Sequence, residues 1–154
     1  GISDYDLNKN GIKQAEETRE ELINEDFDII ISSPLKRAKH TAEIINEKKK
    51  LPLILDDRIK ERNYGKLEGQ LFKKEYCNLN YDFESIDGES LVNYENRLKD
   101  FIQDIKGKYF DKKVLVVAHN GVISVLSCIL EGMPKDGNFE SKGIKNGEVK
   151  EFEI

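Results

Sequence analysis

The sequence predicts an α/β fold with three layers, in which helices cover both faces of a mostly parallel sheet. Two observations lead to this prediction. Apolar runs of strand length alternate with longer stretches whose apolar residues recur at helical spacing, which is the pattern of a parallel sheet. The chain also has 154 residues, enough for one domain with its own core but short for two. We therefore expect a single domain over residues 1–154.

The most informative stretch joins a strand to a helix. Residues 114–118 form an unbroken apolar run, typical of a strand covered on both faces, and residues 123–130 continue in a helix-like apolar pattern. Between them lies His119-Asn120-Gly121, where the glycine allows a tight turn and the next helix offers free N–H groups. Such a junction favours an anion, such as a phosphate or a carboxylate. The alternative is a histidine that only caps the end of the strand.

A second junction of this kind lies earlier in the chain. Residues 27–31 form a short β-branched strand, and a helix follows with Ser33 as its predicted N-cap and Pro34 at its first position. Arg37 then falls in the first turn, where a cation opposes the helix dipole unless an anion lies in front of it. We interpret Arg37 as functional, and the alternative is a salt bridge to an acidic residue of the preceding loop.

A third strand, residues 51–55, leads into a charged loop that contains Glu61. Ligands of parallel sheets bind beyond the carboxyl ends of the strands. Arg37, Glu61 and His119 each follow a different strand, so we expect these three side chains to lie close together. For Glu61, the alternative is a surface ion pair with a neighbouring lysine or arginine.

The rest of the chain predicts further elements. A helix is expected over residues 8–24 with Asn8 as its cap, and an amphipathic helix over residues 90–108. The polar segment 70–90 is expected to form a partly helical lid. Residues 148–154 alternate between polar and apolar and predict a terminal strand.

Composition excludes several classes of function. The formal net charge is −5 and the lysines are dispersed except at residues 48–50, so no basic face for nucleic acid is expected. Cys77 and Cys128 lie far apart, which predicts free thiols in a reducing, cytoplasmic location. No apolar run approaches the length of a membrane span, and no aspartates show the spacing of metal ligands.

Five short blocks follow one another along the chain, at residues 1–4, 32–38, 61–69, 88–90 and 118–121. Each block alone is a weak pattern, but their order and spacing form a specific combination. Together they resemble the signature motifs of the histidine phosphatase superfamily, in its phosphoglycerate-mutase-like branch. The resemblance covers nearly the whole chain and implies a phosphoglycerate-mutase-like fold.

The resemblance also implies an activity. It predicts a phosphatase that acts on phosphate monoesters through a phosphohistidine intermediate, without a cofactor or a metal. Arg37, His119 and Asn120 would bind the phosphate, and Glu61 and His119 would be the catalytic residues. Glu61 would protonate the leaving alkoxide and then deprotonate the attacking water.

The substrate implied by the resemblance is a small phosphorylated metabolite, contacted by a set of substrate-side residues. These are Ser3, Arg62, Tyr64, Glu89 and Ser90. Two alternatives remain open at this point. One is a cofactor-dependent phosphoglycerate mutase, and the other is a catalytically inactive module that binds an anion or a partner.

One departure from the family is serious. The family's first strand ends in Arg-His-Gly, whose histidine becomes phosphorylated, but this sequence contains only His40 and His119. His119 matches the family's second histidine, so the resemblance implies that roughly twenty upstream residues, with the nucleophile and the first strand, are absent. The chain as given is then expected to be inactive. A sheet without that strand beside residues 114–118 is expected to be fragile or to pair with another chain as a homo-oligomer.

Overall fold

The computed structural model describes residues 1–70 and 82–154. Its central layer is a parallel sheet of three strands in the order β2-β1-β3. The strands are β1 (Ile29–Ser32), β2 (Leu53–Leu55) and β3 (Val114–Val117). β1 and β2 begin two residues later than predicted, because hydrogen-bonded pairing starts only there.

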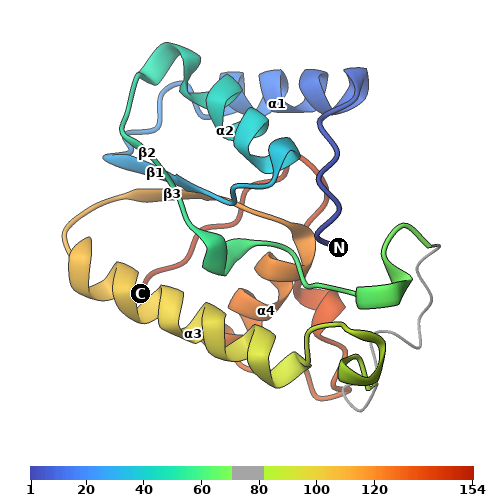
Figure 1. Cartoon of the computed structure of the whole chain (residues 1–154). Helices are drawn as coiled ribbons and strands as arrows, with labels where there is room; N and C mark the ends of the chain where they lie inside the picture. The colour runs from blue at the N-terminus through green and yellow to red at the C-terminus, as the bar shows by residue number, and fades with distance from the viewer. Residues whose placement is uncertain (71–81) are drawn as a thin grey trace.

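Helices cover both faces of this sheet. Helices α1 (Lys9–Glu21) and α2 (Lys36–Lys49) lie on one face, and α3 (Leu91–Lys108) and α4 (Asn120–Glu131) lie on the other (Figure 1). The predicted three-layer α/β fold is therefore confirmed. Each face has its own apolar core because successive residues of a strand point to opposite sides. Ile30 packs in a cluster with residues of α2, whereas Ile31 packs with α3 and α4.

The structure differs from the prediction at the C-terminal end of α1 and at the start of α2. Asn8 caps α1 as expected, and its side chain accepts a hydrogen bond from Gly11 N, but the helix ends at residue 21 because Glu25 N bonds to Leu22 O and turns the chain. The N-cap of α2 is Leu35, not Ser33. Ser33 still extends the sheet through its N–H, which donates to Val117 O, and the first helical hydrogen bond is accepted by Leu35 O from Lys39 N.

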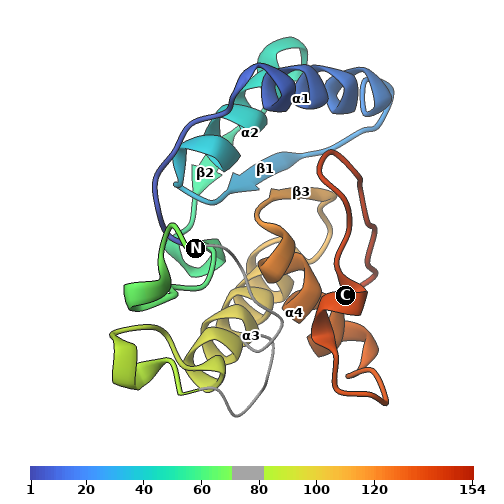
Figure 2. The same cartoon turned by 90° about the vertical axis from the view of Figure 1, so that its right-hand side faces the viewer.

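Strand β3 also differs from its prediction. Only its alternate residues Leu115 and Val117 are buried, and it pairs with β1 alone among the described residues, so it forms an edge of the sheet. A cavity of about 1180 Å³ lies along this edge and is lined by β3, α1, α2 and most of residues 144–154. Figure 2 shows this C-terminal segment, in red, on the β3 side of the sheet.

The predicted terminal strand over residues 148–154 is not formed. A strand needs a partner roughly 4.8 Å away to satisfy its backbone groups. The cavity separates this segment from β3, so the segment meets no strand edge within the described residues. The alternation of polar and apolar residues is therefore present, but no neighbouring strand is available to form hydrogen bonds with this segment.

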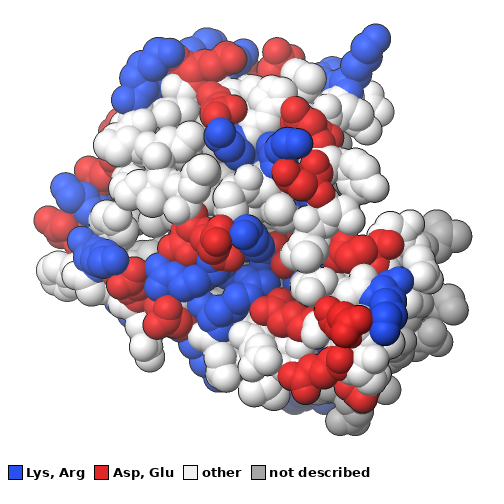
Figure 3. Space-filling model, in the orientation of Figure 1, with Lys and Arg blue, Asp and Glu red and all other residues white. Residues whose placement is uncertain are grey.

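The predicted lid over residues 70–90 falls largely on residues 71–81, which lie outside the described residues, as does Cys77. Of the rest, Glu84–Ile86 forms the short 3₁₀ helix η4. The surface seen in Figure 3 carries acidic and basic side chains that are interspersed. Among the described residues, no helix is both long and apolar enough to cross a bilayer.

Ser90 caps helix α3, which gives this residue a structural role that can be tested. Its hydroxyl accepts a hydrogen bond from Asn93 N at 3.3 Å. Ser90→Ala should lower the free energy of unfolding by about 1 kcal/mol, whereas Ser90→Asp, which keeps a capping oxygen, should retain it. Urea unfolding of both variants checks this. Equal unfolding midpoints for the alanine variant and the unchanged chain would contradict the capping role.

Candidate active site

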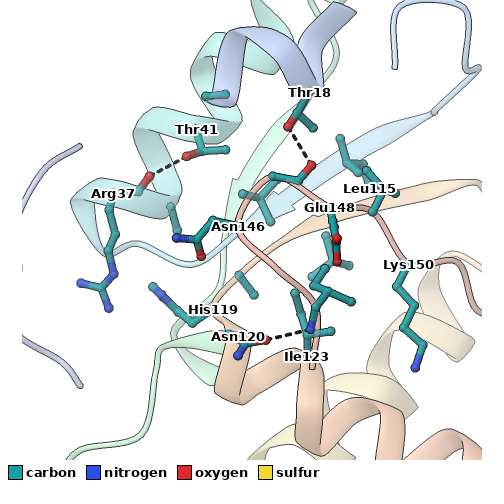
Figure 4. Close-up of a pocket in the computed structure, with 18 of the residues that line it drawn as sticks. Thr18, Arg37, Thr41, Leu115, His119, Asn120, Ile123, Asn146, Glu148 and Lys150 are labelled. Atoms are coloured by element: carbon teal, nitrogen blue, oxygen red, sulfur yellow. Dashed lines mark hydrogen bonds between the residues drawn. The ribbon is translucent and has the colours of Figure 1, made fainter. Parts of the chain in front are cut away.

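Three elements bring charged and polar side chains to one end of the cavity beside β3. Arg37 comes from the first turn of α2, His119 is the N-cap of α4, and Glu61 lies in the loop after the 3₁₀ helix η1 (Asp57–Ile59). All three side chains line the cavity wall, as the sequence predicted. Figure 4 shows Arg37 and His119 at the same end of this pocket.

His119 is held as a neutral imidazole. Only 7% of the residue is exposed, and its Nε2 lies 2.8 Å from the hydroxyl of Ser33. Burial, together with the nearby Arg37 guanidinium, lowers the pKa of His119 from 6.5 to about 3. The ring therefore carries no charge at neutral pH, and it can hydrogen-bond an anion without the cost of burying a cation.

Arg37 is oriented by the first residues of the chain. Its guanidinium donates to Ser3 O at 2.7 Å and to Gly1 O at 2.8 Å. A guanidinium has five N–H donors in a planar fork, so these two bonds fix its direction and leave donors for an anion.

Glu68 in turn anchors this N-terminal segment, a role that the sequence did not reveal. Its carboxylate accepts hydrogen bonds from Ile2 N at 2.9 Å, from the Ser3 hydroxyl at 2.7 Å and from Tyr64 N at 3.0 Å. Burial alone would raise the pKa of Glu68, but these hydrogen bonds lower it overall. The residue belongs to the block 61–69, which is the only signal that pointed to it.

The Glu61 carboxylate is held by backbone and side-chain donors from three elements. Oε1 accepts from Arg62 N at 2.9 Å and from the Tyr94 hydroxyl at 2.8 Å, and Oε2 accepts from Gly121 N at 3.3 Å. Gly121 allows this approach, because a Cβ there would lie 2.5 Å from Oε1. The carboxylate thus lies at the N-terminus of α4, where the helix dipole favours a negative charge.

Asn120 links the site to the C-terminal segment. Its Oδ1 accepts a hydrogen bond from Ile144 N at 2.9 Å. The amide oxygen of Asn120 is therefore engaged by the backbone of the C-terminal segment. Within residues 1–70 and 82–154, no group of three His, Cys, Asp or Glu side chains is gathered as a metal ion would require.

A smaller cavity of about 180 Å³ lies next to Glu61 and is lined by Arg62 and Tyr64, among others. Arg62 is 3% exposed, and its guanidinium carbon lies 4.0 Å from the centre of the Phe83 ring. Its Nε donates to Glu89 O at 2.8 Å, and burial lowers the pKa of this arginine. The structure thus places two of the predicted substrate-side residues in this second cavity.

The other predicted substrate-side residues have different surroundings. Ser3 lines the larger cavity. The Glu89 carboxylate forms an ion pair with Arg97, at 2.6 Å and 2.9 Å, and Ser90 caps α3. Glu89 and Ser90 line neither cavity. The structure therefore does not bring these two side chains to Glu61 and Arg37.

Comparison with known proteins identifies the family. The profile described as histidine phosphatase superfamily (branch 1) matches residues 1–154. The chain belongs to this superfamily. The uncharacterized phosphatase PhoE of Bacillus subtilis is 41% identical over 135 residues, which cover 86% of this chain and 68% of the relative. Phosphoserine phosphatase 1 of Hydrogenobacter thermophilus is 36% identical over 143 residues, with coverage of 86% and 68%.

Solved structures of the histidine phosphatase fold agree with this assignment. The α-ribazole phosphatase of Shigella flexneri superposes with a TM-score of 0.80 at 25% sequence identity. The aligned part covers 96% of this chain and 77% of that structure.

The pKa of His119 predicts how stability depends on pH. Below about pH 6.5 the unfolded chain takes up a proton at this residue, whereas the folded chain does so only near pH 3. The free energy of unfolding should therefore fall as the pH decreases, by on the order of 1 kcal/mol between about pH 6 and about pH 5. Urea unfolding at a series of pH values measures this slope.

His119→Gln is the matched variant for this measurement. Glutamine keeps a hydrogen-bonding group opposite Ser33 but takes up no proton, so this contribution to the slope should disappear. A variant that loses stability on acidification as steeply as the unchanged chain would show that His119 is not held neutral by the fold.

Proposed function

We propose that this domain hydrolyses small phosphate monoesters in two steps, through a phosphohistidine intermediate. The main support is that Arg37, Glu61 and His119, from three separate elements, line one cavity. A fixed cation, a neutral hydrogen-bonding ring and a carboxyl group are the groups that phosphoryl transfer needs besides a nucleophile. Relatives at 41% and 36% identity are named phosphatases, which agrees with this chemistry.

The phosphoryl group would lie between Arg37 and His119. The guanidinium can donate two parallel hydrogen bonds to phosphate oxygens, and the neutral imidazole can donate one. The N-terminus of α4, with Asn120 as its first residue, adds the positive end of a helix dipole beside the same site. These groups are strongest where negative charge spreads over the transferred oxygens in the transition state.

The nucleophile in this proposal is an imidazole supplied by chain outside residues 1–154. Within this sequence His119 contacts Ser33, and His40 lies on the surface with its Nδ1 2.8 Å from Asp6. The cavity of about 1180 Å³ runs along the edge of β3 and ends at Arg37 and His119. An added strand paired with β3 would therefore bring the residue at its carboxyl end next to the phosphate site.

The proposed reaction consists of a phosphorylation step and a hydrolysis step. An imidazole nitrogen attacks phosphorus, the bond from phosphorus to the ester oxygen breaks, and Glu61 gives its proton to the leaving alkoxide. Glu61 then takes a proton from a water molecule that attacks phosphorus. The nitrogen–phosphorus bond breaks and inorganic phosphate leaves.

The alcohol part of the substrate would occupy the second cavity. That cavity of about 180 Å³ borders Glu61, so an ester oxygen at its entrance would lie within reach of the carboxyl group. Arg62 and Tyr64 give it one cationic and one aromatic wall. We therefore propose a small, polar alcohol as the leaving group.

Arg37 provides a test of the phosphate site that requires no turnover. Arg37→Ala should weaken the binding of inorganic phosphate by about tenfold or more, because a charge-assisted hydrogen bond is worth about 1.5 to 3 kcal/mol. Calorimetric titration measures the affinity. Lys39→Ala is the control, since it removes a positive charge from the exposed surface of the same helix. Equal affinities for the Arg37→Ala and Lys39→Ala variants would contradict the site.

Glu61 provides the test of the reaction, using the natural full-length protein. Glu61→Gln should slow hydrolysis of an alkyl phosphate by about 100-fold or more, because a poor leaving group needs the proton. Hydrolysis of p-nitrophenyl phosphate should fall far less. Steady-state kinetics on both esters measures the difference. Glu43→Gln, on the surface of α2, is the matched control.

The products of the same assay separate the alternatives. Release of inorganic phosphate supports the phosphatase. Transfer of phosphate between two hydroxyls of a phosphoglycerate would contradict the proposed phosphatase activity and support a mutase. Phosphate binding that depends on Arg37, without turnover of any ester, would contradict the proposed phosphatase activity and support an anion-binding module.

A further inference from the structure

We propose that Tyr94 is a positioning residue, which fixes the Glu61 carboxyl so that the transferred proton is carried on Oε2. This inference rests on the proposed role of Glu61 as the proton donor. Its basis is a hydrogen bond between two side chains that are far apart in the sequence. The Tyr94 hydroxyl donates to Glu61 Oε1 at 2.8 Å.

The two oxygens of the Glu61 carboxyl have unequal surroundings. Oε1 accepts from the Tyr94 hydroxyl and also from Arg62 N, at 2.8 Å and 2.9 Å. Among residues 1–70 and 82–154, Oε2 accepts one longer hydrogen bond, from Gly121 N at 3.3 Å. An oxygen that already accepts two short hydrogen bonds is a poor place for a proton, because the proton would face two donors. The exchangeable proton therefore resides on Oε2.

Tyr94 can act only as a donor in this pair. Its side chain is almost fully buried, with 1% of the residue exposed. Burial, and next the neighbouring Glu61 carboxylate, raise the pKa of the Tyr94 phenol well above its usual value. The hydroxyl thus keeps its proton throughout the neutral range and holds Oε1 as an acceptor.

The tyrosine itself is fixed by its helix. Its ring packs in the core with Leu98 and Phe101 of α3. One turn further on, the Arg97 guanidinium carbon lies 4.5 Å from the centre of the Tyr94 ring, and Arg97 Nη2 donates to Glu61 O at 3.3 Å. The same helix therefore holds both the backbone and the carboxyl group of Glu61.

Packing accounts for the ring of Tyr94 but not for its hydroxyl. A phenylalanine would fill the same core position without a polar atom to satisfy. The hydroxyl instead contacts Glu61, whose carboxyl group is the only one in the described part of the chain that lines both cavities. This placement is what separates a positioning role from ordinary core packing.

Tyr94→Phe tests the inference in the natural full-length protein, because it removes the hydroxyl and keeps the ring. Turnover of an alkyl phosphate should fall about tenfold, while turnover of p-nitrophenyl phosphate should change little. Combined with Glu61→Gln, it should cause no further loss, since both changes act on the same proton. Tyr109→Phe, at the other end of α3, is the matched control.

The outcomes distinguish this inference from the proposed function. A selective loss on the alkyl ester that is absent in the Glu61→Gln background supports the positioning role. Equal losses on both esters, no loss on either, or losses that multiply with those of Glu61→Gln would overturn it. If Glu61→Gln itself slows both esters equally, the proposed function fails instead, and with it the basis for this inference.

Discussion

The site depends on the parallel pairing of β1 with β3. In their register Ser32 lies opposite Val117, so the two strands end at the same level. The next residue, Ser33, continues the pairing through its backbone and bonds His119 through its hydroxyl. The chain then turns into α2 on one side and α4 on the other. This shared end point is why a residue of α2 and a residue that follows β3 can line the same end of one cavity.

The charge state of the groups at this site depends on burial as well as on neighbouring charges. A buried imidazole next to a guanidinium costs less free energy when it is neutral, and its pKa is accordingly about 3. The site therefore holds one fixed cation, Arg37, and one neutral ring. Glu61, held at the start of α4, supplies a carboxyl group within the same wall. In our proposal this set holds a phosphoryl group, whose oxygen atoms Arg37 and His119 would contact.

The outer edge of β3 has no strand partner among the described residues. A strand edge presents a row of backbone N–H and C=O groups, each costing about 1 to 3 kcal/mol when it is buried without a partner. Here that row faces a cavity of about 1180 Å³ whose far wall is the C-terminal segment. A strand paired at this edge would satisfy these backbone groups and would end beside Arg37 and His119, so stability and the site are coupled in our proposal.

The sequence by itself determined the layers of the fold and picked out three residues that line one cavity. Apolar periodicity is a local property, so it located the helices and strands, and three strand ends identified Arg37, Glu61 and His119. The tertiary structure alone decided which strands are neighbours. The alternation of residues 148–154 could not become a strand, because a ladder requires a partner. It likewise decided the contact of Tyr94 with Glu61, since a hydrogen bond between residues 33 positions apart depends on how α3 packs and leaves no local pattern.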